Sequence, residues 1–195
     1  MSKNINDQAF IVNNKGSVIL ELVFIISIVA LFIKLLLSMA AYQSTVGKLD
    51  RISYSIAGIV RERVRLYDND NVLTQVQVEK LKQLTEQMLL NSGVHYNNLA
   101  MKIETLHFKD TDSPAPIYKI IDERNSLSLS AGAVVCQPTR PLREMDSLSP
   151  YGNAGRWIPL YQVTLCLPTI PWYSALFSPR LPVPAIKSSA ITIER

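Results

Sequence analysis

Proline is absent from more than half of the chain, because all eleven prolines lie at or after Pro114. A proline inside a helix removes a backbone hydrogen bond and clashes with the preceding turn, so its absence permits long helices before that point. From Lys102 onward, short β-prone runs alternate with turns rich in proline, serine and aspartate. The sequence therefore predicts long helices first and short strands afterwards.

The residues of common catalytic and metal sites are scarce, since the chain has two histidines and two cysteines. His95 and His107 have no cysteine or carboxylate at metal-ligand spacing, and we interpret each as an ordinary surface or core residue. The sequence has no glycine-rich phosphate loop and no nucleophile elbow. We therefore expect no enzyme, no metal and no cofactor. The net charge of +4 forms no single basic patch, so no nucleic-acid partner is expected either.

Charged residues are also absent from residues 22–33, and after Lys34 the apolar run continues to Ala41. As a helix, Val18–Tyr42 is about 37 Å long, at about 1.5 Å per residue. That length crosses a hydrocarbon core of about 30 Å. Glu21 is unusual here, because a charge at the centre of a membrane helix costs about 3 kcal/mol or more. Its presence calls for a functional explanation.

The start of this run resembles the processing site of type IV prepilins and pseudopilins, with the sequence Lys15-Gly16-Ser17-Val18-Ile19-Leu20-Glu21-Leu22. In that family a basic, polar leader ends in glycine, and a prepilin peptidase cuts after it. Glutamate is the fifth residue of the mature chain. The resemblance implies a cut between Gly16 and Ser17, with Glu21 in fifth place. It also implies that Glu21 pairs with the free N-terminal amine of a neighbouring subunit.

Two other interpretations of the N-terminal segment remain open. Ser38-Met39-Ala40 is compatible with a conventional secretory signal that is cut near Ala40. An uncleaved single-pass anchor is the third interpretation. The apolar run is long for a secretory signal and contains two charged residues, so the prepilin-type leader, residues 1–16, is favoured. The weakly positive leader favours a cytoplasmic N-terminus and an exported C-terminal domain.

Helical periodicity continues beyond the apolar run. Apolar residues recur at three- and four-residue spacing from Val46 to Tyr67. They predict one continuous helix from about Ser17 to Tyr67. Residues 17–42 would cross the membrane, and residues 43–67 would form an amphipathic continuation.

Residues 68–195 are predicted to form an α+β head. Thr74 and Gln77 suit a capping box for a second helix, whose apolar stripe is Val78, Leu81, Leu84 and Met88. Strand-like runs with no helices between them favour an antiparallel sheet; they are Lys102–Phe108, Ile117–Asp122, Val134–Cys136, Leu160–Leu167 and Ala190–Glu194. The predicted fold is α+β and pilin-like, with the long helix packed across one face of a small sheet.

Both cysteines, Cys136 and Cys166, follow the membrane segment. In an exported domain a disulfide between them is the expectation, and two buried free thiols are the alternative. Aromatic residues gather in the last third of the chain, namely Tyr151, Trp157, Tyr161, Trp172 and Tyr173. We expect them to belong to the core of the sheet, with a contact surface as the alternative.

The whole chain resembles the TadF family of minor pseudopilins from the tight adherence (Tad/Flp) pilus system. The resemblance rests on three blocks: Gly16–Glu21 with its helix, Lys48–Ser55 running into Ile59–Arg63 and Leu66-Tyr67, and Arg156-Trp157 with Leu160–Cys166 and Ser188-Ser189. The major Flp pilin carries tyrosine after its glutamate and is a very short protein. Leu22 stands in that place here, and the head is large, so a minor component is favoured over the pilus shaft.

The TadF resemblance implies a non-catalytic, single-pass protein of the bacterial inner membrane, with its head in the periplasm. It implies a role in the assembly of Flp pili, and so in adherence and biofilm formation. The implied partners are the prepilin peptidase, other Tad pilins and pseudopilins, and the inner-membrane assembly platform. The alternative is a secreted or membrane-anchored binding or adhesin domain, with the aromatic C-terminal third as its ligand surface.

Overall fold

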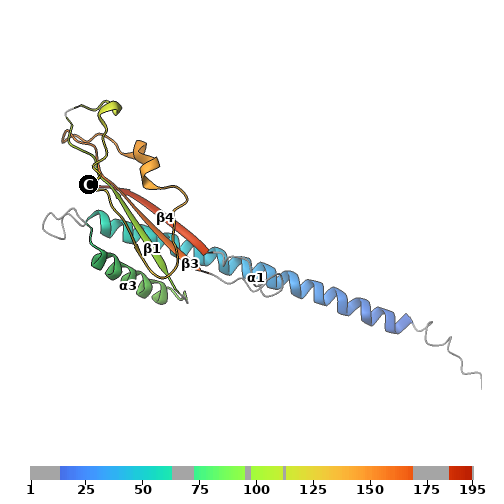
Figure 1. The fold of residues 1–195 in the computed structure, drawn as a ribbon. Coiled ribbons are helices and arrows are strands. Elements are labelled where there is room, and N and C mark those ends of the chain that lie inside the picture. Colours follow the sequence, from blue (N-terminus) through green and yellow to red (C-terminus); the bar gives the residue numbers. More distant parts are fainter. Residues whose placement is uncertain (1–13, 63–72, 95–97, 112, 169–184, 195) are drawn as a thin grey trace, which may run out of the picture. The chain divides into compact units, whose positions relative to one another are not determined.

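The computed structural model describes residues 14–62, 73–94, 98–111, 113–168 and 185–194. The chain divides into two compact units, Met1–Ser44 and Thr45–Arg195, which we call the N-terminal unit and the C-terminal unit. Helix α1 (Asn14–Arg61) contributes residues to both (Figure 1). The helix and sheet elements after α1 all belong to the C-terminal unit.

Helix α1 begins at Asn14, three residues before the predicted start at Ser17. The last residues of the predicted leader are therefore helical, and no proline interrupts the backbone there. Within the described residues α1 ends at Arg61, and Tyr67, the predicted end, lies outside them.

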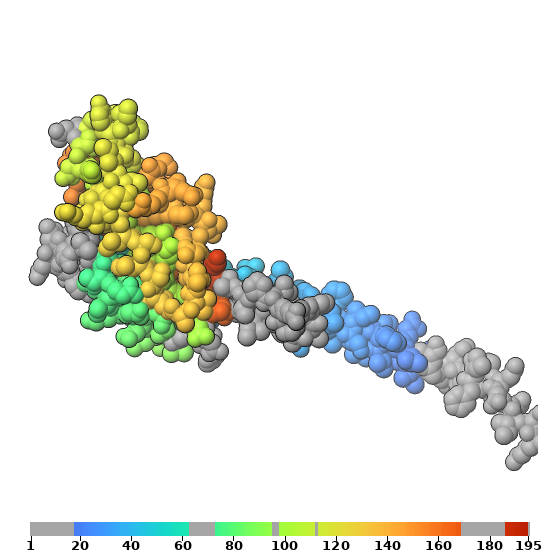
Figure 2. All heavy atoms as spheres, in the orientation of Figure 1, coloured from blue at the N-terminus to red at the C-terminus, as the bar shows by residue number. Residues whose placement is uncertain are grey.

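In the N-terminal unit, α1 exposes its apolar side chains all round, and Figure 2 shows one face of this part in blue. Their exposed fractions run from 45% at Leu35 to 66% at Leu37. Among the described residues, one helix is long and apolar enough to cross a membrane. Its apolar window has a mean hydropathy of 2.8, and none of that window is buried. A helix that is apolar on every side and unburied needs an apolar surrounding.

The C-terminal unit contains one antiparallel sheet with the strand order β2-β1-β3-β4, as Figure 1 shows for its three labelled strands. The strands are β1 (Ala100–Leu106), β2 (Ser128–Ala131), β3 (Leu160–Pro168) and β4 (Ala185–Ile193). Residues 160–167 of β3 are all buried, which fits the inner position of this strand between β1 and β4. The α+β prediction is confirmed.

Two predicted strands are wrong. Pro116 starts a short 3-10 helix, η2 (Pro116–Tyr118), which overlaps the start of the Ile117–Asp122 run, because proline fixes φ and cannot donate to a ladder. The Val134–Cys136 run is not a strand, since the chain leaves the sheet at Gly132, where φ is +113°. The structure instead contains β2, an edge strand whose serines, Ser128 and Ser130, are exposed and polar.

Helix α3 (Gln75–Asn91) begins with the predicted capping box, in which the Thr74 backbone N–H donates to Gln77 Oε1 at 3.0 Å. Val78 of the predicted stripe is buried, Leu81 and Met88 are partly buried against the core, and Leu89 beside the stripe is buried. Leu84 is 38% exposed, so that part of the prediction is wrong, and Thr85 is buried instead. The Thr85 hydroxyl donates to the Leu81 carbonyl at 2.7 Å, so its burial leaves no polar atom unpaired.

The second part of α1 packs in the main core of the C-terminal unit together with α3 and the sheet. It contributes the buried side chains Leu49, Ile52, Ile56, Ala57 and Val60. The Ser53 and Ser188 hydroxyls form a buried hydrogen bond of 2.8 Å, and the Thr192 hydroxyl donates to the Ala57 carbonyl at 3.4 Å. Because Ser53 meets Ser188 and Ala57 meets Thr192, this part of α1 and β4 run in the same direction.

A further 3-10 segment, η3 (Leu142–Leu148), lies between β2 and β3 in the chain. It buries Leu142 in a second apolar cluster with Leu106 and Leu160. The Leu142 backbone N–H donates to Glu104 Oε2 at 3.2 Å, which ties the start of η3 to β1. The η3 segment therefore covers the end of β1 and the start of β3.

Candidate functional site

The predicted processing junction, Gly16–Ser17, lies within the first turn of α1. Both residues are helical, and their side chains lie outside the described ones. Glu21 follows one turn later on the same helix. The structure therefore places the predicted junction and the carboxylate on a single continuous backbone element.

Glu21 is exposed and surrounded in sequence by exposed apolar side chains, including Leu20 at 61% and Leu22 at 55%. Within the described residues its carboxylate has no ion-pair or hydrogen-bond partner. Ser27, on the same helix, differs because its hydroxyl donates to the Val23 carbonyl at 2.8 Å. A hydroxyl can thus be satisfied inside an apolar helix by its own backbone, whereas a carboxylate has no donor left there.

The structure joins Cys136 to Cys166 in a disulfide, with the two Cα atoms 5.6 Å apart. Cys166 belongs to β3, and Cys136 belongs to the segment that follows β2. Both are buried together with Ala100 of β1 in a small apolar cluster. The disulfide therefore holds an irregular segment against the sheet.

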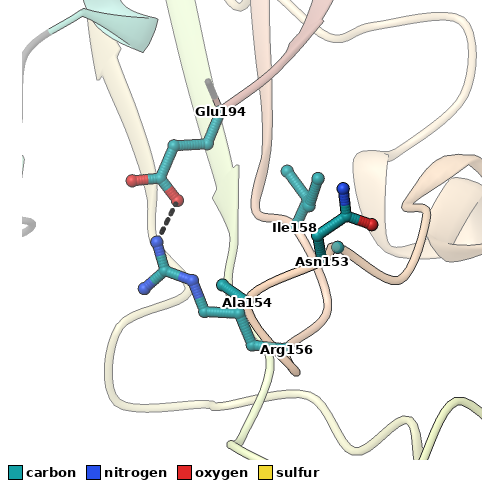
Figure 3. Close-up of a pocket in the computed structure, with 6 residues that line it drawn as sticks. Asn153, Ala154, Arg156, Ile158 and Glu194 are labelled. Carbon is teal, nitrogen blue, oxygen red and sulfur yellow. Dashed lines mark ion pairs between the residues drawn. The ribbon is translucent and has the colours of Figure 1, made fainter.

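A small cavity of about 150 Å³ lies at the end of the sheet where β4 finishes, and Figure 3 shows the residues that line it. The Arg156 guanidinium and the Glu194 carboxylate form an ion pair of 3.8 Å at its edge. Both side chains also line a larger adjoining cavity of about 360 Å³, which includes His107, Asp122 and Trp157. Half of the Arg156 side chain is exposed, so this pair is a weak, solvent-screened contact.

His107 is buried beside this larger cavity and packs edge-on against the Tyr161 ring, with centroids 5.8 Å apart. Neither imidazole nitrogen has a well-formed hydrogen bond within the described residues. Burial lowers the pKa of His107 below its ordinary value, against the smaller raising effects of the Asn125 carbonyl and the Asp122 carboxylate. His107 is a core residue, one of the two places that sequence analysis allowed for it, and it is neutral near pH 7.

Asp122 is an acid whose charge acts on His107. Burial tends to raise its pKa, but hydrogen bonds from the Arg124 backbone N–H and from Asn125 outweigh that effect and lower the pKa overall. The Asn125 side-chain amide donates to Asp122 Oδ2 at 2.7 Å. Asp122 is therefore a structural acceptor that closes its own turn, and it stays ionised near neutral pH.

Lys119 is a structural cation that sequence analysis did not single out. Its Nζ lies 4.4 Å from the Trp157 ring centroid and 5.0 Å from that of Phe108. It also donates to the Ser149 carbonyl at 2.9 Å and to the Asp146 carbonyl. Burial lowers the pKa of Lys119, and Asp146 partly offsets that effect. The lysine ties the η2 segment to the end of η3, and no local sequence pattern signals this long-range contact.

Two of the five aromatic residues in the predicted cluster, Trp157 and Tyr161, are core residues. Trp157 and Tyr161 are buried, and Tyr151 packs edge-on against Trp157 with ring centroids 5.3 Å apart. Trp172, Tyr173 and His95 lie outside the described residues. Among the described side chains, no three of histidine, cysteine, aspartate or glutamate gather closely enough to hold a metal ion. The described features of this unit are structural, and the distinctive chemistry lies at Glu21.

Comparison with known families supplies the identity. The family described as putative tight adherence pilin protein F matches residues 9–195. No curated protein and no solved structure matches the chain. The family match covers nearly the whole chain, and it includes both the exposed apolar helix and the antiparallel sheet. The chain therefore belongs to the TadF family of tight adherence pilin proteins.

Proposed function

We propose that this protein is a minor pseudopilin that takes part in the assembly of Tad/Flp pili, without catalytic activity of its own. A prepilin peptidase cuts between Gly16 and Ser17, and the mature chain stays in the inner membrane through residues 17–42. The C-terminal unit faces the periplasm. Its partners are other Tad pilins and pseudopilins and the inner-membrane assembly platform, and its activity supports adherence and biofilm formation.

One observation carries this proposal: Glu21 is an exposed carboxylate on an exposed apolar helix in a chain of a pilin family. A charge left alone in hydrocarbon is unfavourable, so the carboxylate needs a partner from outside this chain. The free amine that peptidase cutting creates on Ser17 of a neighbouring subunit has the required opposite charge. Glu21 then forms an ion pair with the Ser17 amine of a neighbouring subunit. Because only a processed subunit has that free amine, the ion pair favours the incorporation of processed subunits.

Cutting also improves the position of Glu21 within its own helix. Before the cut Glu21 is the eighth residue of α1, which begins at Asn14, and after it the fifth residue of the chain. A carboxylate near a helix N-terminus interacts favourably with the helix dipole, by about 0.3–1 kcal/mol. Processing therefore creates the amine that pairs with Glu21 of a neighbouring subunit. It also brings Glu21 closer to the N-terminus of its own helix, where the helix dipole favours a negative charge.

The processing step is tested by sequencing the N-terminus of the mature, membrane-extracted protein. We expect Ser17 as its first residue, and we expect Gly16→Ala to block maturation. Gly47→Ala is the matched control, because it makes the same change in the same helix where an added Cβ meets no atom within 4 Å. Ala41 as the first residue would support a secreted domain, and Met1 an uncleaved anchor; either result overturns the processing proposal.

The assembly role is tested with Glu21→Ala and Glu21→Gln. Ser27→Ala is the control, because the Ser27 hydroxyl is a polar group whose hydrogen bond lies within its own helix. Both Glu21 variants should be cut normally but should yield few or no pili, because removing one partner of a buried ion pair costs about 3–5 kcal/mol. Ser27→Ala should assemble normally. Pilus counts at the unaltered level in both Glu21 variants would exclude the proposed pairing.

The alternative, an adhesin or binding domain with an aromatic ligand surface, loses support from Trp157 and Tyr161. Both side chains are buried, at 8% and 4% exposed, and are not available to a ligand on the surface. Tyr151 is half-buried against Trp157, and Trp172 and Tyr173 lie outside the described residues. We therefore retain pilus assembly as the proposed function.

A further inference from the structure

The segment 132–141, which we call the strap, joins β2 to η3, and all of its residues are described. Cys136 is its one buried side chain; Pro138 is half-buried, and the other residues of the strap are exposed. The hydrophobic effect is the main favourable term in folding, so a segment that buries so little apolar surface gains little from it. The strap therefore depends on other contacts to stay on the sheet.

Hydrogen bonds and the disulfide at Cys136 join the strap to the sheet. Lys102 Nζ donates to Gln137 Oε1 at 2.7 Å, and Gln162 Nε2 donates to the Arg140 carbonyl at 3.3 Å. Water competes for these groups once the strap leaves the sheet, so each hydrogen bond stabilises the closed position only modestly. The disulfide is the one covalent contact between the strap and the sheet.

The sheet face beneath the strap is polar. Successive side chains of a strand point to opposite faces, and Met101 of β1 belongs to the main core, so Lys102 and Glu104 cannot both leave the other face. They form an ion pair of 3.3 Å there. Thr164 and Gln162, their register partners on β3, are buried on the same face. The strap therefore covers polar groups and not an apolar surface.

The closed strap leaves a buried acceptor of this face without a donor. Gln162 is 2% exposed, and its Oε1 atom has no hydrogen-bond partner within the described residues. A buried polar atom that has lost its water and gained no partner is unfavourable. Release of the strap would admit water to this amide, so the polar face itself favours release.

The two ends of the strap are held without help from the disulfide. Ala131, the last residue of β2, pairs with Met101. Leu142, the first residue of η3, is buried in the second apolar cluster, and its backbone N–H donates to Glu104. The strap can therefore leave the sheet as a loop while β2 and η3 stay in place. The conformational entropy that the loop regains opposes closure.

We propose that the strap is a redox-controlled device. It is closed over the polar face of β1 and β3 when Cys136 and Cys166 form a disulfide, and it is released as a loop when both are thiols. The sheet, α3 and η3 stay folded in both states, and the Lys102–Glu104 pair becomes accessible to solvent in the released state. The proposal needs the disulfide alone and is independent of the pilus role proposed above.

The reaction that releases the strap is thiol–disulfide exchange with a dithiol reductant. A thiolate of the reductant bonds to one cysteine sulfur while the bond between Cys136 and Cys166 breaks, and the other cysteine sulfur leaves as a thiolate and takes up a proton. The second thiol of the reductant then displaces the mixed disulfide. The protein gains two electrons and two protons, and the reductant becomes a disulfide.

The test measures proteolysis of the full-length chain in detergent by thermolysin, which cuts before large apolar residues. The disulfide form is compared with the chain treated with dithiothreitol, and Ellman titration counts the thiols. Val134 and Val135 provide sites in the strap. Leu148 of η3, which is 52% exposed, provides a matched site outside it. Mass spectrometry after complete reduction assigns each cut.

We expect cutting before Val134 and Val135 to become about tenfold faster or more in the thiol form, because proteolysis follows the population of the open segment. The rate of cutting before Leu148 should be unchanged. An unchanged rate at the strap would overturn the proposal. Equal acceleration at the strap and at Leu148 would also overturn it, since the whole unit would then open together.

Two variants separate the disulfide from the other contacts of the strap. Cys136→Ser with Cys166→Ser should show the thiol-form pattern with or without dithiothreitol, so this variant supplies that form even if the native disulfide resists the reductant. Gln137→Ala removes the Lys102 contact, keeps the disulfide and should cut at the rate of the disulfide form. Strap cutting in Gln137→Ala as fast as in the thiol form would overturn the redox control.

Discussion

Two parts of α1 have the same backbone and opposite surroundings. Before Ser44 its large apolar side chains are all at least 45% exposed, whereas after Thr45 five apolar side chains are at most 5% exposed. Periodicity accounts for the contrast: the first part is apolar on every side, and the second has one apolar stripe. An all-round apolar surface is satisfied by lipid or by other apolar helices, but a single stripe is satisfied by the chain's own sheet.

The comparison also separates two uses of polar groups. In the C-terminal unit the buried Ser53 hydroxyl meets Ser188 of the same chain at 2.8 Å. In the N-terminal unit Glu21 has no such partner among the described residues. The buried Ser53 hydroxyl is thus paired within the chain, whereas the proposed partner of Glu21 belongs to another subunit. This difference fits the proposed role in pilus assembly.

The largest expected effect comes from removing the disulfide, which acts on the C-terminal unit alone. Cys136→Ser with Cys166→Ser should lower the free energy of unfolding of that unit by about 3–4 kcal/mol, since it releases a loop closed across 30 residues. Denaturant unfolding of the full chain in detergent, followed by near-ultraviolet circular dichroism, measures the change. Equal midpoints with and without the disulfide would contradict the expectation.

In the same variant, the helical signal that persists after the C-terminal unit unfolds should be unchanged. That signal comes from the apolar part of α1, which the disulfide does not touch. Far-ultraviolet circular dichroism in detergent reads it. A loss of this residual helix together with the sheet would show that the two parts of α1 are one cooperative unit.

A second prediction compares the two parts of α1 directly. Ile56→Ala should destabilise the C-terminal unit by about 3 kcal/mol, because Ile56 is fully buried and the change leaves a cavity. Ile25→Ala makes the same change on the same helix where the side chain is 52% exposed, and should leave the unfolding midpoint unaltered. Similar midpoint shifts in both variants would contradict the distinction between the lipid-facing and core-facing parts.

The smallest expected effect concerns pH and the buried His107. Because its folded-state pKa lies below the ordinary 6.5, protonation favours the unfolded chain. Its neutral form supports the fold fully above about pH 6.5, and that support is lost as the pH falls toward the folded-state pKa. His107→Phe keeps a ring against Tyr161 and removes the titration, so the decline in unfolding midpoint between neutral and mildly acidic pH should shrink.

The control for this prediction is Asp122, whose pKa is lowered and whose stabilising effect is lost only below its ordinary value of 3.8. Asp122→Asn should therefore change the strongly acidic range more than the range near pH 6. A pH profile that is identical in His107→Phe and in the unaltered chain would remove His107 as the cause. His107 and Asp122 both lie in the C-terminal unit, so both pH effects concern the stability of that unit.

Local signals predicted the elements that depend on neighbours in sequence. The capping box at Thr74 and Gln77 was predicted because its bonds join residues three apart, and β3 was predicted because its apolar run fits an inner strand. Leu84 was wrongly expected to be buried, since α3 turns Thr85 and Leu89 toward the core instead. Which face of a short helix is buried depends on what lies opposite it.

Contacts between distant residues were not predicted. The Ser53–Ser188 bond joins residues 135 positions apart, and the Lys119 contacts depend on Trp157 and η3 being brought together by the fold. β2 escaped prediction because Ser128 and Ser130 give an edge strand no apolar alternation. For the candidate site, the sequence pointed to Glu21, and the structure adds that its carboxylate is exposed on a continuous helix.

The sequence by itself determined the apolar helix, the place of Glu21 within it and the division into a helical first part and a sheet-rich second part. Those features follow from composition and periodicity. Composition sets how favourably a segment moves from water into an apolar environment, and periodicity sets which backbone conformation places its apolar side chains together. Only the tertiary structure decided that Ser53 meets Ser188 and that Lys119 lies over the Trp157 ring. Such arrangements depend on strand register, which pairs residues far apart in the chain and leaves no local trace in the sequence.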